Sequence, residues 1–215
     1  MARAFVSAAL GVLLLCSGCA PRDESASELA AQLHDPLGPW VAAYRQADST
    51  FTLEGLQWRA SDTLSIACTT PPPSMASGEQ RRQLFWIYSP DSAYAVDVDV
   101  YQDVETDAGE IGYDADASTI LVERASERWM TLSFCGTGCR NDDAVWLSPR
   151  RVVLAGWSTN SAGDSAYPVL ALYDIARQRT RGAFGGLIPI DRLSGHADAW
   201  ERTMYARIAR KRRPT

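Results

Sequence analysis

Two cysteines separated by Gly-Thr-Gly are the residues whose type and spacing first suggest chemistry, Cys135 and Cys139 in the stretch FCGTGCRNDDAVWLSPRRVVLAGWS. A structural zinc site usually takes four ligands, and the two histidines of the chain stand alone in the sequence. A redox pair is usually Cys-x-x-Cys at a helix N-terminus, whereas three residues separate these cysteines and no helix signal follows. Two glycines permit a tight turn that brings the cysteine Cα atoms within about 4.4–6.8 Å of each other. We therefore predict a disulfide between Cys135 and Cys139 that staples a turn, with Cys135 and Cys68 as the rival pair.

A second candidate is an acidic stretch between residues 91 and 116, which carries nine acidic residues and no lysine or arginine. Clusters of carboxylate oxygens can bind calcium, which takes six to eight oxygen ligands. The closest set here is Asp97, Asp99 and Asp103. In a strand Asp97 and Asp99 would share one face and the neighbouring valines the other, which predicts a solvent-facing acidic stripe beside a buried one. The spacing lacks the Asp-x-Asp-x-Asp-Gly loop of calcium motifs, so we keep these residues as candidates for binding and predict no metal and no cofactor.

The other polar residues form no catalytic constellation in the sequence. Asn141, Asp142 and Asp143 are interpreted as turn residues before a strand, and Asp142 and Asp143 join the candidates for ligand binding. There is no Gly-x-Ser-x-Gly elbow, no Gly-rich phosphate loop and no His-Glu-x-x-His motif. No catalytic residue is therefore predicted.

The composition indicates what class of protein carries these candidate residues. The chain has 215 residues, of which 46% are hydrophobic and 22% charged, which suits one globular domain with a sizeable core. The net charge of −5 gives no electrostatic support to a nucleic-acid partner.

The N-terminus predicts export. Residues 4–15 form an apolar run that is too short to span a bilayer, which needs about 20 residues, and that fits a secretory signal. The stretch LLLCSGCA resembles the lipobox of bacterial lipoproteins, although Cys16 stands where that family usually has an aliphatic residue. The resemblance implies that Cys19 is the lipidated cysteine. The alternative is a plain signal peptide cleaved near Ala20.

This resemblance, together with the composition and the periodicity of the rest of the chain, predicts the organisation of the chain. Residues 1–18 would be a lipoprotein signal peptide, residues 19–27 a lipidated tether, and residues 28–213 a single β-rich domain with flanking helices. The mature protein would lie in the bacterial cell envelope, on the outer membrane facing the periplasm. That compartment is oxidising, so a disulfide is favoured there.

Periodicity predicts the elements of the domain. Residues 25–47 form two helical pieces interrupted at Asp35-Pro36, and the second should pack on the sheets as a lid. Residues 51–60 alternate as a strand would, and residues 196–213 carry an apolar stripe at helical spacing. That last helix could cap the sheets, or lie on an anionic membrane. Strand pairs are expected within 85–99, 118–136, 145–158 and 167–185.

These strand pairs repeat. IYSPDSAYAVDVD and VWLSPRRVVLAGWS share a Ser-Pro turn followed by an apolar strand, and the stretch WRASDTLSIAC, at 58–68, is a candidate third, truncated copy. The repeats and the ending ALYDIARQRTRG resemble blades of WD and Tol-type propellers over about residues 82–185. They also resemble uncharacterised short bacterial lipoproteins. A closed propeller needs at least four blades. The predicted fold is therefore mainly β, a partial propeller-like or sandwich arrangement of two to three blade-like antiparallel sheets, with N- and C-terminal helices.

The sequence thus predicts a lipid-anchored protein of the cell envelope that acts as a binding or scaffolding module. Its expected partners are the membrane, through the lipid, and an envelope protein or polymer. The alternative is a hydrolase or redox accessory protein that uses the acidic stretch or the cysteines.

Overall fold

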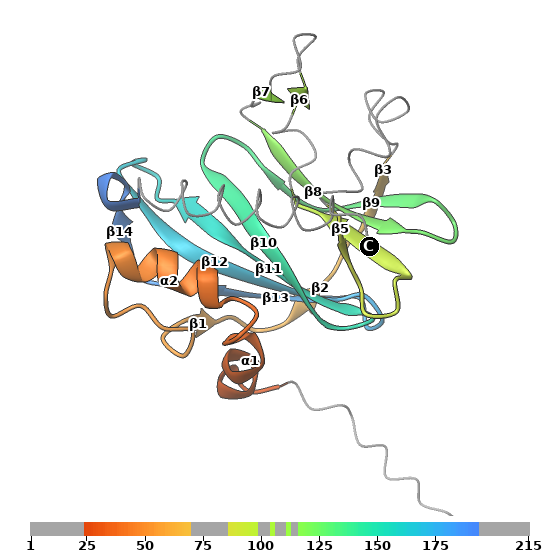
Figure 1. Cartoon of the computed structure of the whole chain (residues 1–215), viewed down its shortest axis with the longest axis horizontal. Coiled ribbons are helices and arrows are strands. Elements are labelled where there is room, and N and C mark those ends of the chain that lie inside the picture. Colours follow the sequence, from red (N-terminus) through yellow and green to blue (C-terminus); the bar gives the residue numbers. More distant parts are fainter. Residues whose placement is uncertain (1–23, 70–85, 99–103, 106–110, 113–115, 194–215) are drawn as a thin grey trace, which may run out of the picture.

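The computed structural model describes residues 24–69, 86–98, 104–105, 111–112 and 116–193. In these ranges the protein is mainly β, with two antiparallel sheets and two short α-helices (Figure 1). Neither of these helices is long and apolar enough to cross a membrane. The signal segment, the lipidation site and the helix predicted at 196–213 lie outside the described residues, so those predictions stay predictions.

The larger sheet, which we call sheet A, is built on four long strands from the second half of the chain. They run in the order β13–β12–β11–β10, and every neighbouring pair is antiparallel. Three short strands are added at its margins, β1 and β2 on β13 and β14 on β12. The bounds are β1 Gln57–Trp58, β2 Asp62–Thr63, β10 Cys139–Ser148, β11 Arg151–Thr159, β12 Ser165–Asp174, β13 Arg179–Phe184 and β14 Ile188–Pro189.

The smaller sheet, sheet B, is built from strands that precede β10 in the chain and has the order β3–β9–β8–β5–β4, also antiparallel. A separate two-stranded ribbon is formed by β6 and β7. The bounds are β3 Ala67–Thr69, β4 Ile87–Tyr88, β5 Tyr94–Asp97, β6 Val104–Glu105, β7 Ile111–Gly112, β8 Ala117–Glu123 and β9 Arg128–Cys135.

Each predicted repeat corresponds to four neighbouring strands of one sheet, β4–β5–β8–β9 in sheet B and β10–β11–β12–β13 in sheet A, with the ribbon β6–β7 inserted between β5 and β8. The two Ser-Pro turns lie side by side, because Arg150 Nη1 is 3.1 Å from Asp91 Oδ2. The guanidinium of Arg150 also lies 4.5 Å from the ring centroid of Tyr94. The prediction of blade-like antiparallel sheets is confirmed as far as two antiparallel sheets, and the described residues form no closed propeller or barrel.

Residues 51–68, which follow the helices, differ from the sequence prediction in two ways. Residues 51–56 form turns, in which Gly55 N–H donates to Thr52 Oγ1, and not an alternating strand. Residues 58–68 form no sheet of their own, because β1 and β2 pair with β13 of sheet A whereas β3 pairs with β9 of sheet B. The segment therefore covers one edge strand of each sheet, and the third repeat copy predicted there is wrong.

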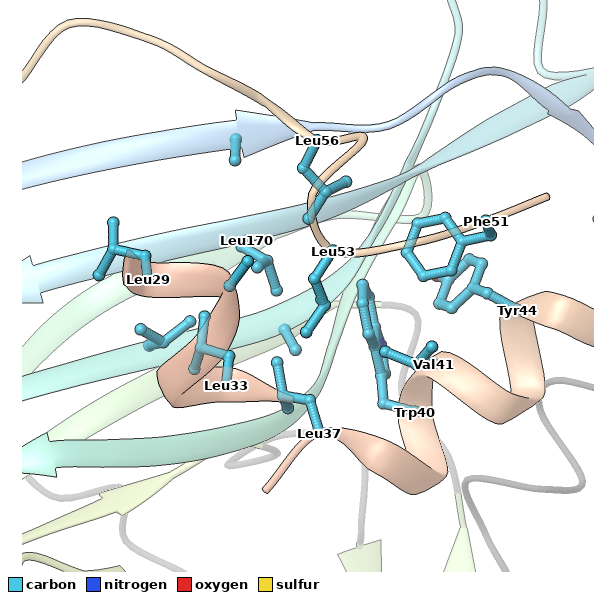
Figure 2. Close-up of a cluster of buried hydrophobic side chains, with 14 of the residues drawn as sticks. Leu29, Leu33, Leu37, Trp40, Val41, Tyr44, Phe51, Leu53, Leu56 and Leu170 are labelled. Carbon is cyan, nitrogen blue, oxygen red and sulfur yellow. The ribbon is translucent and has the colours of Figure 1, made fainter. Parts of the chain in front are cut away.

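One face of sheet A is covered by helix α1, Ala26–Leu33, and helix α2, Gly38–Ala47, as the lid prediction expected (Figure 2). A capping box at Ser25 and Glu28 starts α1. Figure 2 shows that apolar side chains of both helices and of the turns after them converge on Leu170 of β12. The fully or nearly fully buried members are Leu29, Leu33, Leu37, Trp40, Tyr44, Phe51, Leu53, Leu56 and Leu170.

The opposite face of sheet A packs on sheet B. Val152 and Leu154 of β11 and Tyr173 of β12 share one buried cluster with Val96 of β5 and Leu121 of β8. The two sheets therefore form the layers of a sandwich, and the helices form a third layer outside sheet A.

Candidate functional site

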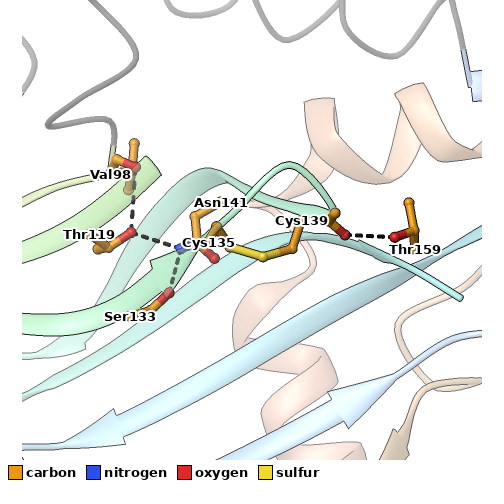
Figure 3. Close-up of a disulfide and its surroundings, with 8 residues drawn as sticks. Val98, Thr119, Ser133, Cys135, Cys139, Asn141 and Thr159 are labelled. Carbon is orange, nitrogen blue, oxygen red and sulfur yellow. Dashed lines mark hydrogen bonds between the residues drawn. A yellow bond between two sulfur atoms is a disulfide. The ribbon is translucent and has the colours of Figure 1, made fainter. Parts of the chain in front are cut away.

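Cys135 and Cys139 lie where the chain passes from sheet B to sheet A (Figure 3). Cys135 is the last residue of β9 and Cys139 the first of β10. Their sulfur atoms form a disulfide and their Cα atoms are 5.2 Å apart. Cys68 is a free, exposed cysteine in β3. The predicted pair is confirmed, and the rival pairing of Cys135 with Cys68 is wrong.

Gly138, next to Cys139, packs closely against the side chain of Thr159. The carbonyl of Gly138 accepts hydrogen bonds from Thr159 N at 2.7 Å and from Thr159 Oγ1 at 3.0 Å. A Cβ atom at position 138 would lie 2.9 Å from that hydroxyl oxygen, closer than ordinary van der Waals contact. Polar contacts continue past the turn, where Asn141 Nδ2 donates to Thr119 Oγ1 at 2.8 Å and to Ser133 Oγ at 2.9 Å (Figure 3). The disulfide thus fixes the connection between the sheets, and both of its cysteines lie at strand ends, with no helix dipole to activate a thiol.

The acidic candidates are placed differently from the expectation. Val96 and Val98 are buried as predicted, but Asp97 is also buried, with 2% of its surface exposed. The reason is that β5 is an inner strand covered on both faces, with Val96 in the layer between the sheets and Ala95 in a second cluster around Trp86. The predicted solvent-facing stripe is therefore wrong at Asp97. Asp99 and Asp103 lie outside the described residues, and within the described ranges no three His, Cys, Asp or Glu side chains are grouped to hold a metal ion.

Asp142 and Asp143 are strand residues of β10 and not the turn residues that we expected. A bulge in the pairing of β10 with β11 falls at Asp142, which leaves it outside the regular register. Its carboxylate is buried, accepts a hydrogen bond from Trp40 Nε1 at 3.2 Å, and lies 3.8 Å from Arg140 Nε. Burial and the nearby charge of Asp142 raise the pKa of Tyr44 well above its ordinary value. Asp142 therefore joins α2 to the sheet, while Asp143 accepts from Ala144 N at 2.7 Å.

A cluster of arginines that sequence reasoning missed lies on the helix-covered face of sheet A. The register places Arg151 of β11, Asp174 of β12 and Arg179 of β13 in one row across three strands. In the next inward-facing row, Leu172 pairs with Arg181, and beyond it the face is apolar and covered by the helices. Together these residues line a cavity of about 170 Å³ at the end of the sheet beside α1, which we call the arginine pocket. Its charged residues are Glu24, Arg151, Asp174, Arg177, Arg179 and Arg181.

Two carboxylates neutralise part of this charge. Arg151 Nη1 donates to Glu24 Oε1 at 3.0 Å, and its Nη2 donates to Glu24 Oε2, so the pair is bidentate. The hydrogen bond from Arg151 holds the pKa of Glu24 below its ordinary value, and the same pair raises the pKa of Arg151. Asp174 Oδ2 lies 3.3 Å from Arg177 Nη1 and 3.9 Å from Arg151 Nε.

The other two arginines of the pocket contact uncharged oxygens in the part of the chain that the structure describes. Arg179 donates from Nε to Ser61 Oγ at 3.0 Å, and Arg181 donates from Nε to the Arg59 carbonyl at 3.0 Å and from Nη1 to the Glu24 carbonyl at 2.8 Å. Four guanidinium groups thus face two carboxylates in the pocket lining, although the whole chain carries a net charge of −5. This arrangement can bind an anion, because guanidinium groups match the geometry of carboxylate and phosphate oxygens.

The sequence did hold a weak signal for this site. In RVVLA, LALYD and RTRGA the charged residues Arg151, Asp174, Arg179 and Arg181 stand at inward positions of otherwise apolar or small strands. Such positions are normally apolar, so charge there indicates a site or a paired network.

Comparison of the whole chain with models of protein families, with curated proteins and with solved structures finds no match.

Proposed function

We propose that this protein is a lipid-anchored module of the bacterial cell envelope that binds an anionic group of another envelope component in the arginine pocket. The observation that carries the proposal is the pair Arg179 and Arg181, which add two positive charges to the pocket and contact uncharged oxygens among the described residues. A ligand that brings phosphate or carboxylate oxygens would replace these weaker contacts with charge-assisted hydrogen bonds.

The size of the pocket limits what it can take. Sites for drug-sized molecules usually measure about 300–1,000 Å³, whereas this cavity measures about 170 Å³. We therefore propose recognition of one phosphate or carboxylate group that belongs to a larger envelope protein, polymer or lipid.

The proposal includes the lipid on Cys19 and the blade-like character of the two meanders. The lipid rests on the resemblance of LLLCSGCA to a lipobox. The blade-like character is supported by two consecutive four-stranded antiparallel units that share a Ser-Pro turn at the same place. In this proposal the sandwich is the scaffold and the arginine pocket is the binding site.

The test of anion binding uses the protein purified from bacterial membranes in dodecyl maltoside and titrated calorimetrically with pyrophosphate. Saturable binding is expected. Arg179→Gln should weaken it about tenfold or more, because a hydrogen bond to a charged group contributes about 1.5–3 kcal/mol and 1.4 kcal/mol is a factor of ten. The matched control is Arg192→Gln, an exposed arginine outside the pocket. Equal affinity of all three proteins, or no binding, would contradict the assignment of the site.

The test of the anchor is the intact mass of the same purified protein. A mature chain that begins at Cys19 and carries the added mass of a diacylglycerol is expected. A chain that begins elsewhere, or that carries no lipid, would contradict the anchor and leave anion binding to be judged by the titration.

A further inference from the structure

We propose that the anionic group bound by the arginine pocket is the headgroup phosphate of a phospholipid in the same membrane that holds the lipid anchor. This inference rests on the proposed function above and names the ligand of its site. The pocket would then be a second, non-covalent contact that fixes how the sandwich lies on the bilayer.

The position of the pocket along the chain supports a ligand close to the membrane. Glu24, whose side chain and carbonyl both lie in the pocket, is only five residues after Cys19. Five residues span at most roughly 18 Å even when fully extended, at about 3.3–3.6 Å each. A lipid on Cys19 therefore keeps the pocket within that distance of the headgroup layer, whatever conformation the connecting residues adopt. Tethering at such a short distance gives headgroups a high effective concentration at the site.

The pocket also lies at an accessible end of the molecule. Arg177 belongs to the hairpin turn between β12 and β13, and Arg179 begins β13, and both residues are exposed. The turn between β10 and β11 ends at the same place, because Arg151 pairs with Asp174. Figure 1 shows α1 beside this part of sheet A, far from β14. A flat membrane surface can thus reach the pocket arginines without contacting the disulfide-stapled end of β10.

Local charge, and not the net charge, decides whether an anionic membrane attracts this surface. The chain carries a net charge of −5, which would repel an anionic bilayer as a whole. At physiological ionic strength charges are screened over about 8 Å. The pocket arginines would lie at contact distance, whereas acids elsewhere on the sandwich would be screened, so attraction at the pocket prevails.

Phosphate suits the pocket better than a further carboxylate. One carboxylate position is already occupied by Glu24, which takes both Nη groups of Arg151. The arginines that contact no carboxylate among the described residues, Arg179 and Arg181, lie two positions apart on the same face of β13, so a ligand that meets both must offer oxygens to two separate guanidinium groups. A phosphate group offers oxygens in several directions at once, whereas a carboxylate offers two in one plane.

The experiment measures how fast individual arginines react with phenylglyoxal, by mass spectrometry of peptides. The lipid-bearing protein is compared in dodecyl maltoside micelles, which contain no phosphate, and in vesicles that contain phosphatidylglycerol. A third sample is in micelles with soluble glycerol 3-phosphate. In phosphatidylglycerol vesicles the reaction of Arg179 and Arg181 should slow about tenfold, because a tethered site at high effective concentration is occupied most of the time. Arg192, in the 3₁₀ helix Ile190–Leu193 that follows β14 and outside the arginine pocket, should react at the same rate in all samples.

A variant separates binding from general shielding. Arg179→Gln removes an exposed side chain at the end of the strand, so the fold should tolerate it, and Arg181 should then lose most of its protection in vesicles. Equal protection of Arg192 would mean that the membrane shields the whole surface, which overturns the inference. Protection by soluble glycerol 3-phosphate without protection by vesicles also overturns it, while the proposed binding of anions stands. Protection in neither sample overturns the inference and the proposed function together.

Discussion

At the scale of single residues, the disulfide between Cys135 and Cys139 has a structural role. The Cys135–Cys139 bond closes a loop of a few residues at the crossover between the sheets, and the Gly138 carbonyl is held by Thr159 beside it. The geometry that the two glycines allow explains why the pair could be predicted from spacing alone. Reaction of either cysteine would have to break the disulfide that constrains the turn between β9 and β10.

Removal of this bond predicts a modest loss of stability. Cys135→Ser should lower the free energy of unfolding by about 2 kcal/mol, the low end of the usual 2–4 kcal/mol, because the closed loop is short. Urea denaturation of oxidised protein measures the loss, and dithiothreitol should lower the stability of the natural chain by a similar amount. Cys68→Ser is the control, since Cys68 is free and exposed and its removal should change little. An equal loss in both variants would mean that the disulfide contributes nothing specific.

Two features of single residues, the burial of Asp97 and the arginine pocket, could not be predicted from the sequence. Alternation predicted Asp97 on the surface, but alternation describes a sheet with one wet face, and β5 is covered on both faces. The arginine pocket could not be assembled from the sequence, because its bidentate pair joins Glu24 to Arg151, 127 residues apart. Only the pairing of three strands brings Arg151, Asp174 and Arg179 into one row.

At the scale of elements, most of the strands and both helices could be predicted because local signals agree. The Ser-Pro turns, the apolar alternation of β10 to β13 and the break at Asp35-Pro36 each mark a boundary that the structure has within a few residues. The strand predicted after α2 was wrong, because Phe51 and Leu53 alternate as in a strand although they pack against the helices from turns, together with Leu56. Local pattern cannot distinguish these two ways of burying alternate residues.

We expect that truncating one buried side chain of the helical layer, Leu33, will greatly lower the free energy of unfolding. Leu33 of α1 is fully buried against sheet A, so Leu33→Ala should lower the free energy of unfolding by about 2–5 kcal/mol through the lost burial and the cavity. Gln46→Ala is the matched control, because Gln46 is exposed in α2 and alanine favours a helix. Chemical denaturation of both variants measures the difference. If Leu33→Ala proved as stable as the control, α1 would not be part of the cooperative core.

At the scale of the whole molecule, two sheets and a helical layer are held together by segments that join them and by shared cores. Residues 57–69 pair with both sheets in turn, and the disulfide fixes the one crossover between the two meanders. The salt bridge between Asp91 and Arg150 joins the equivalent turns of the two sheets. The N-terminal end of the described chain is attached to this framework at the arginine pocket, where Glu24 contacts Arg151 and Arg181.

The ion pair between Glu24 and Arg151 should make the stability of the fold depend on pH. The pKa of Glu24 is lowered in the folded protein from its ordinary value of 4.5, chiefly by the hydrogen bond from Arg151. A lowered pKa means that the pair stabilises the fold fully above pH 4.5, and that this stabilisation is lost as the pH falls through the folded value. Glu24→Gln should therefore be less stable than the natural chain at pH 7, and the gap should narrow by pH 3. Urea denaturation at both pH values measures the gap, with the exposed Glu54→Gln as the control. A gap of the same size at pH 7 and pH 3 would show that the ion pair does not hold the N-terminal segment on the pocket.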